Sequence, residues 1–282
     1  MTSRIKAALS AAAATAVLLL AACSAPTKLA PPPPPPAPAI TLGPALLEQA
    51  SAYRYYMTHV AEITPDFQDG TAIARSLQVG EAYEPTQLLR GAIAYGAVAA
   101  LQDPAFVAGV KTYAGDADQR RQIAYAIMRD PAYAVGLPGS ASAAGLVVAA
   151  LGTEAQKLYD NGKAVKQSAY DIQKQPWSKV DVPNRDLRLN QAKTLSATPI
   201  VGDLAETARL RQASTGALTL GLSASPVSPP YSPVVVRGLA VAALAILGEA
   251  GDANLPTVMA VMAEPNVGFC MNMSKLNLYQ CL

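Results

Sequence analysis

Cys23 is the residue of this sequence whose type and position most clearly predict chemistry. It follows an apolar run from Ala7 to Ala22, and that run follows two basic residues, Arg4 and Lys6. A short basic segment followed by a short apolar segment is typical of a secretory signal. The thiolate of cysteine is a nucleophile, so a thiol at the end of such a signal is placed at the membrane surface, ready to accept a transferred group.

The residues Leu20-Ala21-Ala22-Cys23 resemble the lipobox of bacterial lipoproteins at all four positions. The resemblance covers only this tetrapeptide and the signal before it. It implies that Cys23 receives a diacylglycerol, that residues 1–22 are removed as a signal peptide, and that the new amine is acylated with a fatty acid such as palmitate. Ser24 follows the cysteine in place of Asp, which implies outer-membrane sorting. The alternative is an ordinary signal peptide with a chance cysteine.

The two remaining thiols belong to Cys270 and Cys281. In an oxidising periplasm an even pair of cysteines predicts a disulfide. One continuous helix would place them about 16 Å apart, whereas the Cα atoms of a disulfide lie ~5.5 Å apart. The pairing therefore requires a turn, for which Asn272 and Ser274 offer suitable side chains. Two unpaired thiols, or thiols bonded to another chain, are the alternative.

The sequence predicts no catalytic, cofactor-binding or metal site. His59 is the only histidine, which excludes sites built from several histidines. The mature chain contains no G-x-S-x-G, S-x-x-K or C-x-x-C pattern. A pair of carboxylates would suffice for a glycosidase. Lytic transglycosylases are helical and often lipid-anchored, but their catalytic glutamate usually precedes a serine, and no glutamate here does so.

A proline-rich tether is predicted over residues 23–43. Six consecutive prolines begin at Pro31, and such a segment favours the polyproline II conformation, at about 3.1 Å per residue. The apolar run before Cys23 is about 24 Å long as a helix, too short for a ~30 Å hydrocarbon core. We therefore expect a lipid anchor in the membrane and a spacer behind it.

Composition predicts an all-α, alanine-rich, single multi-helix domain over residues 44–282. Alanine-rich sequence with few β-branched runs favours closely packed helices. The chain has 22 basic and 20 acidic residues, and removal of Arg4 and Lys6 with the signal leaves 20 of each. A neutral mature chain argues against a nucleic-acid partner, which requires a basic surface.

Several helices can be located from capping residues and apolar periodicity. Helical patterns begin at Pro44 and near Glu84, and the dipeptides Asp103-Pro104 and Asp130-Pro131 place an N-cap acid before an N1 proline. The segment from Val234 to Leu247 is apolar on all sides except for one arginine, which predicts a buried core helix.

The clearest helical pattern runs from Thr153 to Gln175. Its apolar and small residues alternate at spacings of three and four, which is a seam for close helix packing; we call these residues the seam: Ala155, Leu158, Gly162, Val165, Ala169 and Ile172. The segment 200–222 is the expected antiparallel partner, with Trp177 near the exposed tip of the pair as a partner-binding anchor. The alternatives are that the seam packs on the domain core and that Trp177 is a buried hinge residue.

These observations favour a lipid-anchored protein of the cell envelope that is non-catalytic and binds a protein partner or supports an envelope assembly. A cell-wall-degrading enzyme resembling a lytic transglycosylase is one alternative, and a helical carrier of a lipid or small molecule is another. A deep apolar cavity would favour the carrier, two facing carboxylates the enzyme, and a flat exposed patch on residues 153–222 the partner-binding protein.

Lipidation gives the first testable prediction. Cys23→Ser replaces the thiol with a hydroxyl, a much weaker nucleophile, so the variant should carry no diacylglycerol and should remain uncleaved after residue 22. Mass spectrometry of the N-terminal peptide from both proteins measures this. A wild-type N-terminus that is unmodified and begins at another residue would exclude the lipoprotein interpretation.

Overall fold

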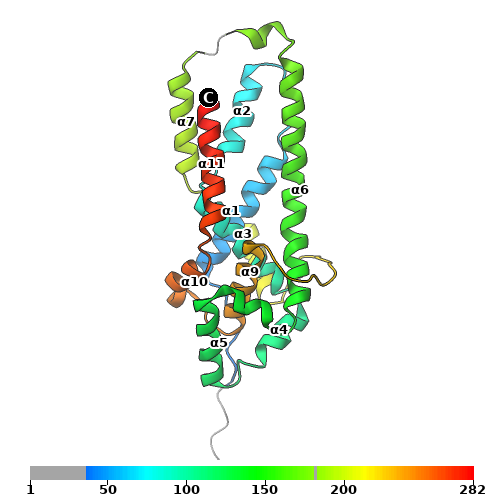
Figure 1. Ribbon diagram of the computed structural model, residues 1–282, viewed down its shortest axis with the longest axis vertical. Coiled ribbons are helices and arrows are strands. Elements are labelled where there is room, and N and C mark those ends of the chain that lie inside the picture. Colours follow the sequence, from blue (N-terminus) through cyan, green and yellow to red (C-terminus); the bar gives the residue numbers. More distant parts are fainter. Residues whose placement is uncertain (1–35, 181–182) are drawn as a thin grey trace, which may run out of the picture. The chain divides into compact units, whose positions relative to one another are not determined.

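The chain folds into helices joined by loops, the longest of which in the described residues spans 215–232 (Figure 1). The computed structural model describes residues 36–180 and 183–282, so the predicted signal peptide, Cys23 and most of the tether lie outside the described residues. Within those residues there are eleven α-helices, three 3-10 helices and no strand, apart from one isolated bridge between Leu42 and Ala250. The prediction of an all-α fold is confirmed.

The α-helices are α1 (Pro44–Ala61), α2 (Gly70–Glu81), α3 (Pro85–Ala100), α4 (Pro104–Lys111), α5 (Ala117–Arg129), α6 (Ser140–Ile172), α7 (Arg185–Ala197), α8 (Leu204–Ser214), α9 (Pro233–Ile246), α10 (Leu255–Val261) and α11 (Pro265–Cys281). The 3-10 helices are η1 (Pro131–Gly136), η2 (Pro176–Lys179) and η3 (Asp252–Asn254).

Acidic residues followed by proline start several helices. The Asp103 carboxylate accepts a hydrogen bond from the backbone N–H of Phe106 at 2.7 Å and caps α4. Glu84 caps α3 and Glu264 caps α11 in the same way. Such a side chain satisfies backbone donors that the first helical turn leaves unpaired. The predicted start at Asp130 is found too, although the element it opens is the 3-10 helix η1.

The core surrounds α3, which packs against α1, α6 and α9. As predicted, α9 is almost entirely buried. Small residues allow close contact between these helices. A Cβ atom on Gly91 of α3 would lie 2.5 Å from the carbonyl oxygen of Gln49 and 2.6 Å from the Cβ of Tyr53, both in α1. The backbones of α1 and α3 therefore approach each other as closely as glycine permits.

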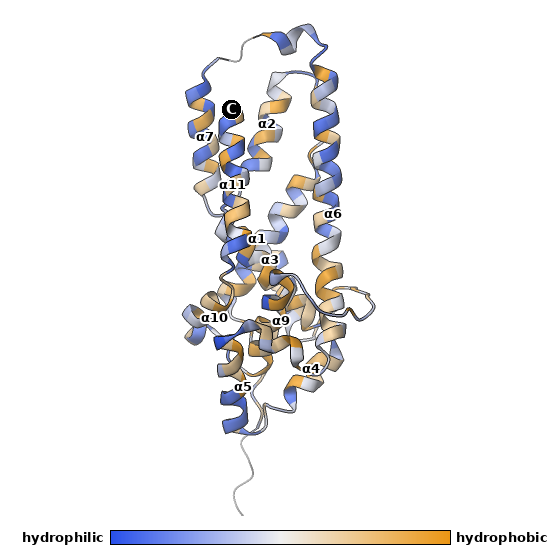
Figure 2. Ribbon diagram, viewed as in Figure 1, coloured by the Kyte–Doolittle hydropathy of each residue, from blue (hydrophilic) through white to orange (hydrophobic). Residues whose placement is uncertain are grey.

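Helix α6 is 33 residues long and belongs to two environments. Its first turns, including Ala143 and Val147, are buried in the core, and its later turns extend beyond the core beside α2 (Figures 1 and 2). Two contacts with α1 hold it along the way. Arg54 pairs with Glu154 at 2.5 Å, and the side-chain amide of Asn161 donates to a backbone carbonyl of α1 at 2.8 Å.

The predicted antiparallel partner of the seam is wrong. Residues 200–222 form only the short helix α8, followed by irregular chain, and α8 packs on α1 and α3. Periodicity identified the apolar face of α6 correctly but not the element opposite it. Gly162 shows the consequence, because a Cβ placed on it would meet nothing within 4 Å. The small seam residues are thus not there to admit a partner backbone.

No single helix among residues 36–180 and 183–282 has both the length and the apolar composition to cross a membrane. Helices α3 and α4 reach that length together, but they meet at a bend of 87°.

Alanine at Gly91 and alanine at Gly162 should have opposite effects on the free energy of unfolding. Gly91→Ala should lower the free energy of unfolding by about 1–3 kcal/mol, because its methyl group would overlap the backbone of α1. Gly162→Ala should raise it by up to about 1 kcal/mol, because the site is open and alanine is the better helix former. Urea denaturation of both variants measures this, and equal effects at the two sites would contradict the close α1–α3 contact.

Candidate functional site

An apolar groove lies between α2 and the second half of α6. Helix α2 contributes Ile73 and Leu77, and α6 contributes Val165 and Ala169, to a cavity of about 390 Å³. The buried ring of Phe67, from the loop between α1 and α2, also lines it. All of the seam except Ala155 lines this cavity. The most regular apolar pattern in the sequence therefore borders a cavity along most of its length.

A second cavity, of about 610 Å³, continues the groove toward the end of α6. The two cavities share Ile73, Leu77, Glu81, Ala169 and Ile172. Residues of α7, the end of α11 and Trp177 of η2 also line the second cavity. Trp177 is partly buried, so its position is intermediate between the two sequence interpretations. Its ring borders the groove, where a bound molecule would alter its environment.

Glu81 is a buried carboxyl group on the groove side of α2. It follows Leu77 by four residues and Ile73 by eight, so the three side chains share one helix face. Only 4% of the residue is exposed, and its Oε2 atom has no hydrogen-bond partner among the described residues. Burial raises the pKa of this carboxyl above its ordinary value, and the nearby Lys275 opposes that shift in part.

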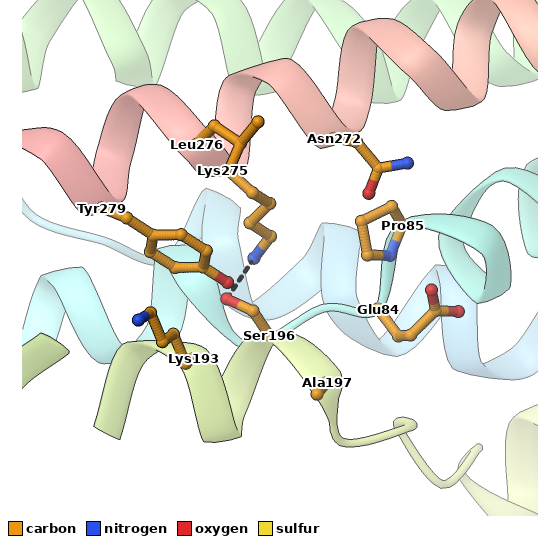
Figure 3. A pocket seen from close by; sticks show the side chains of 9 residues that line it. All are labelled: Glu84, Pro85, Lys193, Ser196, Ala197, Asn272, Lys275, Leu276 and Tyr279. Atoms are coloured by element: carbon orange, nitrogen blue, oxygen red, sulfur yellow. Dashed lines mark hydrogen bonds between the residues drawn. The ribbon is translucent and has the colours of Figure 1, made fainter. Parts of the chain in front are cut away.

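Lys275 joins three helices, and Figure 3 shows its bond to Ser196 of α7. Its ammonium group, from α11, donates to the backbone carbonyl of Glu81 at the end of α2, and to Ser196 Oγ of α7 at 3.0 Å. It also lies 3.4 Å from the ring centre of Tyr83, a cation–π contact. Burial lowers the pKa of Lys275 to about 8, although the carboxylates of Glu81 and Glu84 favour its charged form.

Ser196 and Lys275 are close enough to suggest a nucleophile and its base, but the direction of their hydrogen bond is wrong for catalysis. A general base must accept the serine proton. Here Ser196 Oγ instead donates to the Glu81 carbonyl at 3.3 Å and accepts from the lysine. The same carbonyl and the Tyr83 ring stabilise the ammonium form of Lys275. We therefore interpret this cluster as a structural joint between α2, α7 and α11.

The predicted disulfide between Cys270 and Cys281 is wrong. Both thiols are free and exposed, and both lie on the continuous helix α11. The residues expected to form a turn instead bond within that helix. The Asn272 side chain donates to the carbonyl of Gly268 at 2.9 Å, and the Ser274 hydroxyl donates to the carbonyl of Cys270 at 3.1 Å. Cys281 also lines the second cavity of the groove.

His59 packs on the ring of Tyr55 in the same helix. The two rings are stacked with their centres 3.8 Å apart, and His59 Nδ1 lies 2.8 Å from the Tyr55 carbonyl oxygen. Among residues 36–180 and 183–282, no group of three His, Cys, Asp or Glu side chains is placed to hold a metal ion. Cys23, the predicted lipid attachment site, lies outside these residues.

Sequence reasoning missed Glu81, Ser196 and Lys275. One signal was available, because Lys275 is the only charged residue of α11. A single charge on an otherwise uncharged helix indicates a specific partner. Its partners, however, lie 194 and 79 residues away in the chain, and no local pattern connects them.

Comparisons with known proteins found no matching family model, no similar curated protein and no similar solved structure. The function of this chain must therefore be argued from the groove and the groups around it.

The buried lysine predicts how stability depends on pH. Folded Lys275 releases its proton near pH 8, whereas the unfolded chain keeps it until about pH 10.5. The unfolded state therefore binds more protons between these values, and the free energy of unfolding should rise with pH there. Lys275→Met should remove this rise, whereas Lys193→Met, on the exposed face of α7, should keep it.

Urea denaturation between pH 7.5 and 9.5 measures the effect. The upper limit avoids the ionisation of tyrosines in the unfolded chain, since burial raises the pKa of Tyr53, Tyr56, Tyr83 and Tyr95 in the folded protein. Their contribution has the opposite sign and begins near pH 10. Identical pH profiles for wild type and Lys275→Met would contradict the burial of this ammonium group.

Proposed function

We propose that this protein is a lipid-anchored envelope protein that carries a hydrophobic, chain-shaped ligand in the groove between α2 and α6. The observation that supports the proposal is the position of the seam. Five apolar or small residues, regularly spaced along α6, line the groove. Apolar surface of this kind is costly to leave in water, and a contiguous apolar patch usually marks a binding site.

The dimensions of the groove suit one acyl chain. Small-molecule sites usually occupy about 300–1,000 Å³, and the two cavities measure about 390 and 610 Å³. From Leu158 to Ile172 the seam extends about 21 Å, at 1.5 Å per residue. One leaflet of a bilayer, half of the ~30 Å hydrocarbon core, is shorter than this, so an acyl chain can lie along the seam at full length.

The enzyme alternative receives no support from this groove. Asp69 and Glu81 both line the second cavity. They are twelve residues apart across the same helix, or about 18 Å. Paired catalytic carboxylates of glycosidases lie about 5–9.5 Å apart. In addition, the Asp69 carboxylate is engaged as the N-cap of α2, where it accepts from the backbone N–H of Ala72.

Binding of a protein partner is the second candidate function, and α11 carries the observation that favours it. Phe269, Met273 and Leu276 are 65%, 39% and 50% exposed. Their spacings of four and three place them on one face of the helix. An exposed apolar stripe suits a protein contact, and this function would stand alone if the groove bound nothing.

Blocking the groove tests the carrier function. Ala169→Phe places a ring where the two cavities meet, and it should weaken binding of the apolar dye 1-N-phenylnaphthylamine at least tenfold, or about 1.4 kcal/mol. Lys166→Phe adds the same ring at an exposed position of α6 that lines neither cavity, and it should leave binding unchanged. A dye titration followed by fluorescence measures both affinities.

Two results would count against the carrier function. One is the absence of saturable dye binding to the wild-type protein. The other is equal affinity of wild type and Ala169→Phe, which would place the dye outside the groove.

A further inference from the structure

Glu81 Oε2 is one of five buried side-chain polar atoms without a hydrogen-bond partner among the described residues, and the only one of the five that belongs to a carboxyl group. A buried polar atom without a partner costs about 1–3 kcal/mol, and more if it is charged, so each such atom calls for an explanation. Only 4% of Glu81 is exposed, yet its Oε2 atom has no hydrogen-bond partner among the described residues. The backbone carbonyl of the same residue, in contrast, receives bonds from Ser196 and Lys275.

The position of this carboxyl group coincides with the junction of the two cavities. Glu81 lines both of them, together with Ile73 and Leu77 from its own helix and Ala169 and Ile172 from α6. These four neighbours are apolar, so the carboxyl is a single polar point on an apolar lining where the cavities overlap. Sites for small molecules are commonly built in this way, with a few polar groups that fix the orientation of a largely apolar ligand.

We propose that Glu81 is the polar anchor of the groove and that it selects an amphiphile with an uncharged hydroxyl headgroup, such as a monoacylglycerol. The hydroxyl bonds to the free carboxyl oxygen, and the acyl chain lies along the seam of α6. This inference rests on the proposed carrier function and specifies the chemical class of its ligand.

The charges around Glu81 disfavour two other classes of headgroup. A fatty acid would bring a second carboxyl group against Glu81, and two carboxyl groups that share one site cannot both ionise without repulsion. An alkyl amine would bring an ammonium group toward Lys275, which is already bonded to the Glu81 carbonyl. A hydroxyl carries no charge and is both a donor and an acceptor. It therefore pairs with this carboxyl in either protonation state, which matters because burial favours the neutral form.

A competition experiment with full-length protein tests the proposal. Three amphiphiles with the same fourteen-carbon chain, 1-monomyristoylglycerol, myristate and tetradecylamine, would displace 1-N-phenylnaphthylamine below their micellar concentrations. For the wild-type protein we expect 1-monomyristoylglycerol to bind at least tenfold more tightly than either charged compound. This order of affinities requires no variant and is itself a test.

Substitutions then assign the preference to one residue. Glu81→Leu keeps a side chain of similar volume but removes the hydrogen bond, so the dye should still bind while the preference for the glycerol headgroup falls below about threefold. Glu81→Gln keeps an acceptor oxygen and should retain most of the preference. Glu62→Leu, at an exposed position at the end of α1, removes one carboxylate elsewhere and should leave the preference unchanged.

The outcomes separate this inference from the carrier function. If the wild-type protein binds the dye but all three amphiphiles with equal affinity, or binds a charged one best, the role of Glu81 is refuted and the carrier function stands. The same conclusion follows if Glu81→Leu keeps the wild-type preference. If the wild-type protein binds no dye, the carrier function itself fails.

Discussion

One ammonium group holds together the three helices on one side of the groove. Lys275 ties α11 to the carbonyl at the end of α2 and to the hydroxyl of Ser196 on α7, and the ring of Tyr83 covers it. These helices surround the second cavity with few contacts to the core. A buried charge is stable only when its hydrogen bonds are satisfied, so the three helices must keep their mutual positions for Lys275 to remain paired.

The contacts of Lys275 also explain why the backbone carbonyl of Glu81 is hydrogen-bonded whereas its side-chain Oε2 atom is not. Its backbone carbonyl has donors from two helices, because α2 ends there and the carbonyl has no partner four residues further along its own helix. Its side chain points along the face shared by Ile73 and Leu77 and has no donor for Oε2. The backbone of this residue thus contributes to the framework, while its side chain contributes to the lining. Among the residues that line both cavities, Glu81 is the only polar one.

The success of sequence reasoning depended on the range of each interaction. Helix starts such as Asp103-Pro104 were predictable because the capping carboxylate and the backbone N–H that donates to it lie three residues apart. The buried helix α9 was predictable because its apolar composition alone requires burial. The element opposite the seam was not predictable, because periodicity identifies the apolar face of a helix but not the element that lies against that face. The cysteine pair was predicted wrongly because Asn272 and Ser274 serve equally well inside a helix, where they bond back to carbonyls four residues earlier. The cluster around Lys275 joins residues far apart in the chain, so no local signal defines it.

Helix α6 crosses from the core into the groove without interruption, and this continuity has a thermodynamic consequence. Its first turns are held by burial against α3 and α9, whereas the turns beyond Asn161 have little more than their own backbone hydrogen bonds and marginal helix propensity to hold them. Opening of the last turns therefore requires far less free energy than global unfolding, and the Arg54–Glu154 pair confines the opening to the distal end. We expect amide protection along α6 to decline in steps toward Ile172, so that one helix is anchored in the core at its first turns and opens most readily at its last turns.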